Sequence, residues 1–96
     1  MIRHFNELTP AQDERLALLM EECAEVIQVV GKIQRHGYES RHPNGGPTNR
    51  ELLEKELGHV SAALSLMVGA QDVRVSAISC SNYAKRENVK QYLHHQ

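Results

Sequence analysis

Two long stretches of the chain repeat apolar residues at the three- and four-residue spacing that is typical of an α-helix. The first begins at Thr9, which suits the N-cap position, with Pro10 at the first helical position and Gln12 completing a capping box. Its pattern continues to about Arg35 and stops at Gly37, a residue type that favours helix ends. We therefore expect one helix of about 26 residues, which at 1.5 Å per residue is about 39 Å long.

The second long stretch opens on another capping box, formed by Thr48 and Glu51, and should run to about Gly69. The residues between the two helices, 37–47, are rich in Gly, Pro, Asn and Ser and predict a loop. Eleven residues make a long connection for a small helical protein. The loop therefore either moves or has a function, and a plain solvated connection is the alternative.

The third stretch is less regular. Asp72 could cap a helix that runs through Tyr83 to Leu93, whereas Val73-Arg74-Val75 alternates as a β-strand would. We expect the helix, because a single strand in this chain would have no partner.

These elements predict an all-α protein, with two long antiparallel helices and a shorter C-terminal helix in a single domain over residues 1–96. With one Phe, three Tyr and no Trp, its core should be aliphatic. The first long helix is apolar on two sides, and three helices cannot cover both. We therefore expect oligomerisation to complete the helical bundle, as a homodimer or a homotetramer.

Composition and charge exclude several classes of protein. Twelve acids against eleven bases give a net charge of −1, which argues against general affinity for nucleic acid or membrane surfaces. No signal peptide and no apolar run long enough to cross a bilayer is evident. Cys23 and Cys80 show neither metal-binding nor redox spacing. We therefore expect a reduced, cytoplasmic protein.

Carboxylates interrupt an apolar line on each long helix. On the first helix the line is Leu18, Glu22, Glu25 and Val29, and on the second it is Leu52, Glu56, His59, Ala63, Leu66 and Ala70. Each helix also carries an uninterrupted line that predicts ordinary core: Leu16, Leu19, Cys23, Val26, Val30 and Ile33 on the first, and Leu53, Leu57, Val60, Leu64 and Val68 on the second. Acids seldom occupy an apolar line unless a cation meets them there.

If the two helices are antiparallel neighbours, Glu22 and Glu25 can face Glu56 and His59. Two carboxylates about 5 Å apart repel by roughly 3 kcal/mol at an effective dielectric constant near 20. A divalent cation reverses that effect, and oxygen ligands with room for water suit Mg²⁺, which in such sites usually binds phosphate oxygens. The alternative, which the pattern leaves open, is a solvated acidic face paired with basic residues one turn away.

The same residues carry a family resemblance. Glu21-Glu22-Cys23-Ala24-Glu25, followed after a loop by Glu56-Leu57-Gly58-His59, resembles the EExxE…ExxD signature of the all-α, MazG-like nucleoside triphosphate pyrophosphohydrolases. The similarity extends through residues 35–40 and 48–51 to residues 90–96, where it is closest to small phage-type members. It covers most of the chain. EExxE alone is a weak signal, but the second motif on the next helix makes the match fairly specific.

The resemblance implies a helical bundle that forms obligate dimers or tetramers and hydrolyses a nucleoside triphosphate to the monophosphate and pyrophosphate with Mg²⁺. The expected cytoplasm is that of the host if the protein is phage-encoded. Glu22, Glu25 and Glu56 would be metal ligands, and Glu21 would orient or deprotonate water. Base recognition and phosphate contacts would involve residues that we nominate from the sequence as substrate-binding candidates: His4, Phe5, Tyr38, Lys85 and Lys90.

His59 departs from the family pattern, which has aspartate at this position. Imidazole is a poor ligand for Mg²⁺, so the resemblance predicts either a site with greater tolerance for Mn²⁺ or a catalytically impaired nucleotide-binding or regulatory protein of the same fold. A purely structural helical bundle is the third alternative.

Overall fold

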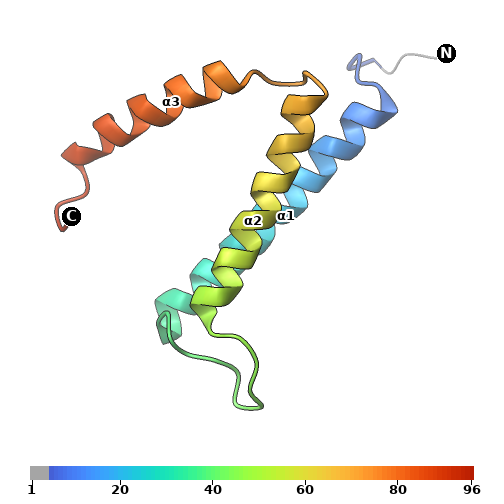
Figure 1. The fold of residues 1–96 in the computed structure, drawn as a ribbon. Helices are drawn as coiled ribbons and strands as arrows, with labels where there is room; N and C mark the ends of the chain where they lie inside the picture. Colours follow the sequence, from blue (N-terminus) through green and yellow to red (C-terminus); the bar gives the residue numbers. More distant parts are fainter. Residues whose placement is uncertain (1–4) are drawn as a thin grey trace. The chain divides into compact units, whose positions relative to one another are not determined.

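The computed structural model describes residues 5–96, which form three α-helices and one short 3₁₀ turn (Figure 1). The helices are α1 (Pro10–His36), α2 (Asn49–Gly69) and α3 (Val75–Asn88), and the 3₁₀ turn η1 spans Val89–Gln91. Within residues 5–96 no strand forms, and one isolated antiparallel bridge joins Arg41 to Thr48. The prediction of an all-α chain with two long helices and a shorter third one is confirmed.

Both ends of α1 follow the local chemistry of the sequence. The Gln12 N–H donates to Thr9 Oγ1 at 3.1 Å, and the Thr9 N–H donates to Gln12 Oε1 at 2.9 Å, which completes the predicted capping box. At the other end, Gly37 adopts a φ of +88°, and its N–H donates to the Ile33 carbonyl at 2.7 Å. Glycine tolerates this left-handed conformation without a Cβ penalty, and the helix therefore ends where it was predicted to end.

A second capping box opens α2. The Thr48 N–H donates to Glu51 Oε1 at 3.0 Å, and the Glu51 N–H donates to Thr48 Oγ1 at 3.2 Å. Thr48 is itself buried, so this box holds both the start of α2 and the end of the preceding loop. The helix ends at Gly69, as predicted.

The predicted start of the third helix at Asp72 is wrong. The N-cap of α3 is Arg74, which has extended backbone angles and forms no side-chain capping bond. Asp72 lies three residues before the first helical residue, Val75, and an N-cap must directly precede that residue. The helix ends at Asn88, so Leu93 lies beyond it.

The chain divides into two compact units, Met1–Leu66 and Met67–Gln96. In the first unit α1 and α2 run side by side in opposite directions, joined by the loop of residues 37–48 (Figure 1). The second unit contains the end of α2 followed by α3 and η1. That residues 1–96 form a single domain stays a prediction.

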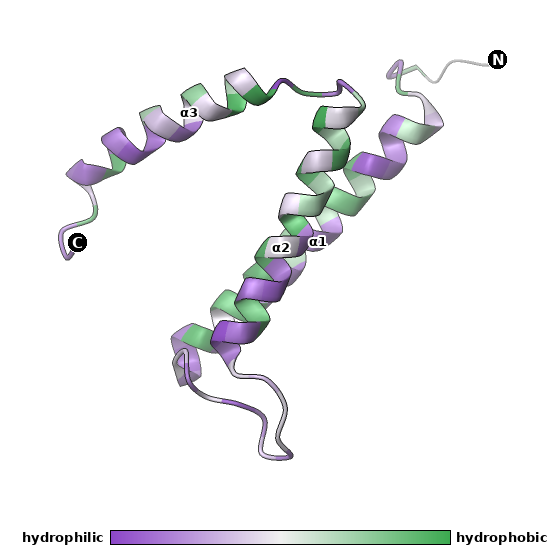
Figure 2. Cartoon of the chain, viewed as in Figure 1, coloured by the Kyte–Doolittle hydropathy of each residue, from purple (hydrophilic) through white to green (hydrophobic). Residues whose placement is uncertain are grey.

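The buried side of the helical hairpin is the side that carries the carboxylates. Among the described residues of the first unit, the buried apolar side chains are Val29 and Ala63, and Glu56 is buried as well. In the second unit, Met67 is buried. Figure 2 shows hydrophobic positions interspersed with hydrophilic ones along both long helices.

Half of the line on α1 that was predicted to be ordinary core is exposed in the single chain, and the other half (Leu19, Val26 and Ile33) is half-buried. Leu16 and Val30 are 40% and 38% exposed, and Cys23 is exposed as well. The neighbouring side chains Met20 and Ile27 are each 72% exposed. The reason is that α2 packs along the line of Glu22 and Glu25, which leaves the predicted core line only partly covered. On α2, Leu57 is likewise exposed, whereas the rest of its predicted line is half-buried.

Among the described residues, none of the helices combines the length and the apolar character that crossing a membrane requires.

Candidate metal centre

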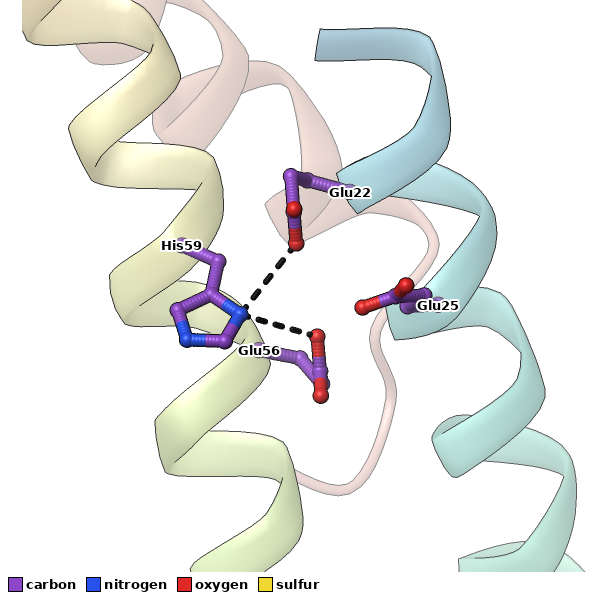
Figure 3. Close-up of side chains that lie close together, drawn as sticks. All are labelled: Glu22, Glu25, Glu56 and His59. Carbon is purple, nitrogen blue, oxygen red and sulfur yellow. Dashed lines mark ion pairs between the residues drawn. The ribbon is translucent and has the colours of Figure 1, made fainter. Parts of the chain in front are cut away.

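Four side chains from α1 and α2 meet in the middle of the hairpin (Figure 3). Glu22 and Glu25 lie one turn apart on α1, and Glu56 and His59 lie one turn apart on α2, so the i,i+3 spacing directs each pair toward the other helix. Each of the four residues offers one ligand atom, and all four atoms lie within 4.8 Å of one another. We call these four residues the carboxylate cluster.

His59 lies between two of the carboxylates. Its Nδ1 is 3.2 Å from Glu22 Oε2 and 3.4 Å from Glu56 Oε2. The His59 side chain is 48% exposed, whereas those of Glu22 and Glu56 are 14% and 9% exposed. A solvated acidic face would leave its carboxylates in water, so that alternative does not describe Glu22 or Glu56.

Two oxygens of the cluster, Glu22 Oε2 and Glu56 Oε2, are buried and form no hydrogen bond, although both lie within ion-pair distance of His59 Nδ1. Lys55 Nζ approaches the other Glu56 oxygen, Oε1, at 3.7 Å, but the lysine side chain is 58% exposed. Water therefore screens this ion pair, and it stabilises Glu56 only weakly. Buried carboxylate oxygens without hydrogen bonds are costly, and either a protonated His59 or a bound cation would satisfy them.

The proximity of the carboxylates changes their affinity for protons. The pKa of Glu25 is raised to about 7. The largest cause is a hydrogen bond with Glu56, and the smaller causes are desolvation and the negative charge of Glu22. The same hydrogen bond, together with the nearby His59, lowers the pKa of Glu56. As the pH falls below about 7 the pair therefore takes up one proton, which resides mainly on Glu25. A cation entering the cluster would take the place of that proton.

The donor set fits a divalent cation. Carboxylates supply three oxygen ligands, and His59 supplies one nitrogen. Ligands on opposite sides of Mg²⁺ are about 4.2 Å apart, since each bond is about 2.1 Å long. The four ligand atoms lie within 4.8 Å of one another, which is close to that spacing. The nitrogen is the less favourable member for Mg²⁺ and is well tolerated by Mn²⁺ and later transition metals.

The remaining predicted site residues of the first unit lie outside the cluster. Glu21 is exposed on α1, and its negative charge contributes to the raised pKa of Glu25. Tyr38 lies in the loop after α1, where the Arg50 guanidinium stacks 4.5 Å from its ring centroid. Phe5 is 93% exposed before α1. His4, also nominated for substrate binding, lies outside the described residues.

The two predicted phosphate-binding lysines belong to the second unit. Lys85 lies in the last turn of α3 and is exposed. Lys90 lies in η1, where its Nζ pairs with Glu87 Oε2 at 2.8 Å. That these lysines contact phosphate stays a prediction.

A basic cavity at the loop end of the hairpin was not predicted from the sequence. It lies between the last turns of α1, the loop and the first turn of α2, and its lining includes Lys32, Arg35 and Arg41. A signal was present in the sequence, because residues 32–42 contain three Lys or Arg, two His and a single acid. Spread over a helix end and a loop, these residues match no recognised motif.

Comparisons of the chain with protein-family models, with curated proteins and with solved structures gave no match.

Proposed function

We propose that the protein is a Mg²⁺-dependent nucleotide pyrophosphohydrolase, which converts a (deoxy)nucleoside triphosphate to the monophosphate and pyrophosphate. The observation that carries the proposal is the carboxylate cluster, whose four ligand atoms lie within 4.8 Å of one another and in which two carboxylate oxygens are buried without a hydrogen bond. The cluster supports a divalent cation. The substrate class comes from the resemblance of its residues to the MazG-like signature.

In this proposal Glu22, Glu25 and Glu56 hold the cation, and His59 supplies either a fourth ligand or a hydrogen bond to a carboxylate. Bound there, Mg²⁺ would neutralise phosphate oxygens and polarise the α-phosphorus. The exposed Glu21 would orient the attacking water and accept its proton. Water would then bond to the α-phosphorus, while the bond to the bridging oxygen breaks and pyrophosphate leaves.

We also propose that a second copy of the chain covers the exposed apolar side of α1. Leu16, Met20, Cys23, Ile27 and Val30 follow one another at alternating four- and three-residue steps on that side, and all five are exposed. This spacing is typical of helices that pack in bundles. A homodimer or homotetramer would bury the stripe, and light scattering at micromolar concentration tests this, since a monomer would contradict it. A cytoplasmic location remains part of the proposal.

A second candidate function follows from His59. A nitrogen where the family signature has a carboxylate reduces the negative charge of the cluster by one unit and removes an oxygen ligand. A protein with such a cluster could bind a nucleotide and no longer hydrolyse it, acting as a nucleotide-binding or regulatory protein.

A pyrophosphate-release assay distinguishes the two functions when it is run beside a thermal-shift screen. The panel consists of the ribo- and deoxyribonucleoside triphosphates, each with Mg²⁺, with Mn²⁺ and with a chelator. Metal-dependent turnover supports the enzyme, and a thermal shift without turnover supports the binding protein. No response in either assay would contradict both and leave a structural bundle.

The matched variants are Glu56→Gln and Glu54→Gln. Both lie on α2 and remove one negative charge, but Glu56 is buried in the cluster, whereas Glu54 is exposed outside it. We expect Glu56→Gln to abolish turnover and Glu54→Gln to retain it. Equal loss of activity in both variants would contradict the assignment of the cluster.

A further inference from the structure

The cavity at the loop end of the hairpin is separate from the carboxylate cluster in both position and charge. Its volume is about 490 Å³, within the usual range for small-molecule sites. Lys32 and Arg35 line it from α1, Arg41 from the loop and Leu52 from α2. The lining contains no carboxylate, and Lys32 lies seven residues beyond Glu25, about 10 Å farther along the helix.

Hydrogen bonds fix the conformation of the loop that forms one wall of the cavity. The Asn49 N–H donates to the Ser40 carbonyl at 2.8 Å, and the Arg50 N–H donates to the Tyr38 carbonyl at 2.9 Å. Asn49 is buried, and its side-chain Nδ2 donates to the Gly37 carbonyl at 3.1 Å. These bonds tie the two ends of the loop together at the start of α2. The cavity is therefore formed before any ligand arrives, which reduces the entropic cost of binding.

The cavity is positively charged, because the single acid of the loop pairs with an arginine that does not line the cavity. Glu39, the single acid of residues 37–47, pairs with Arg50, whose Nη2 lies 2.6 Å from Glu39 Oε1. Arg41 donates from Nη1 to the Gly46 carbonyl at 3.2 Å, which positions its guanidinium and leaves further N–H donors. His42 Nδ1 accepts from the Asn44 N–H at 3.1 Å, so the neutral ring carries its hydrogen on Nε2 as a donor.

We propose that this cavity binds the phosphate group of a small organic phosphate of nucleotide size, without a divalent cation. Two arginines and one lysine provide charge-assisted hydrogen bonds to a phosphate. Pro43, Pro47 and Leu52 provide an apolar surface for the organic part. The proposal does not rest on the proposed hydrolase function, because the cavity and the carboxylate cluster have no lining residue in common.

Calorimetric titration of the full chain in the presence of a chelator tests the proposal. The probes are AMP, UMP and inorganic phosphate, and amide chemical shifts in NMR spectra locate the binding. We expect the nucleoside monophosphates to bind more tightly than inorganic phosphate and to shift amides of residues 32–52 at the loop end. Affinity should fall as salt is added, since the cations are exposed.

The variants Lys32→Gln and Arg35→Gln should each weaken binding by about tenfold, the usual effect of losing one charge-assisted hydrogen bond. Both residues are exposed on α1, and glutamine is a good helix former, so the fold should persist. Arg86→Gln is the control, because it removes the same charge from an exposed position of α3 that does not line the cavity. Glu22→Gln changes the carboxylate cluster and not the cavity, so this variant should bind the phosphate probes with the same affinity as the wild type.

Three results would overturn the proposal. The first is no binding at millimolar concentration of the probes. The second is binding that Lys32→Gln and Arg35→Gln leave unchanged, or that Glu22→Gln abolishes. The third is equal affinity for inorganic phosphate and for both nucleoside monophosphates, which would show that the organic part of the ligand does not contribute to binding. Failure of the hydrolase assay, in contrast, does not bear on this binding.

Discussion

The substitution His59→Asp tests most directly how the carboxylate cluster binds metal. His59 Nδ1 lies 3.2 Å from Glu22 Oε2 and 3.4 Å from Glu56 Oε2, so a carboxylate at this position would join the other acids. It would replace a nitrogen donor by an oxygen donor and add one negative charge. We expect Mg²⁺ to bind the variant more tightly, because Mg²⁺ prefers oxygen ligands.

The size of the effect follows from the dimensions of the cluster. The largest separation among the ligand atoms of the cluster is 4.8 Å. A carboxylate charge at that distance from a divalent cation attracts the cation by about 1.7 kcal/mol, even with the full dielectric constant of water. That energy corresponds to about 18-fold tighter binding. Direct coordination would shorten the distance, so about 18-fold is the smallest gain that we expect for a true ligand position. Without metal, the variant should melt at a lower temperature than the wild type, because its acids repel one another more strongly.

The assay is calorimetric titration of Mg²⁺ and of Mn²⁺ into the wild type, His59→Asp and His59→Asn. The asparagine variant matches the aspartate in size but carries no charge, so it separates the effect of charge from that of shape. Mn²⁺ should discriminate less between the variants, since it accepts imidazole more readily. In the pyrophosphate-release assay, His59→Asp should raise or create Mg²⁺-dependent turnover.

Equal Mg²⁺ affinities for the wild type and His59→Asp would refute the reasoning. Position 59 would then not be a ligand, and His59 would only form a hydrogen bond with Glu56 or with water. Tighter binding by His59→Asn to the same degree as by His59→Asp would also contradict it, because the gain would then not arise from charge.

Three further predictions concern the carboxylates, the second helix cap and the exposed stripe. Glu56→Gln should weaken Mg²⁺ binding at least tenfold in calorimetry, whereas Glu54→Gln should leave it unchanged. The Thr48 N–H and hydroxyl lower the pKa of Glu51 below its ordinary 4.5, so this cap stabilises the fold above pH 4.5 and loses its contribution as the pH falls toward the lower, folded-state pKa. Glu51→Gln should therefore flatten the fall of the melting temperature in acid, and an unchanged pH profile would contradict this. Ile27→Asp places a charge in the middle of the exposed apolar stripe and should dissociate the proposed oligomer in light scattering, while an unaltered mass would show that the stripe is not the interface.

Local chemistry in the sequence determined where the two long helices begin and end. Thr9 with Gln12, and Thr48 with Glu51, satisfy helix N-termini through bonds that span three residues, so they depend on no distant part of the chain. Gly37 ends α1 through its own backbone conformation. The third helix was predicted less well, because Asp72 is a good capping residue by type but lies too far ahead of Val75.

Tertiary structure decided which side of each helix is buried. Periodicity identified two apolar lines on α1 but could not determine which of them α2 would cover, and the line predicted as core proved to be exposed at Leu16 and Val30. Periodicity did indicate that Glu22 and Glu25 could face Glu56 and His59, because the two long helices were expected to be antiparallel neighbours. The separation of their ligand atoms by 4.8 Å or less, the burial of the Glu22 and Glu56 side chains and the raised pKa of Glu25 depend on packing across two helices.

The basic cavity depended on tertiary structure most of all. Lys32 and Arg35 are ordinary residues of a solvated helix end, and Arg41 and His42 are ordinary loop residues. They become neighbours because hydrogen bonds from Asn49 and Arg50 fold the loop back to the start of α2. A pattern along the chain reports contacts between residues three or four positions apart, whereas a cavity closed by contacts nine or more residues apart exists only once the chain has folded.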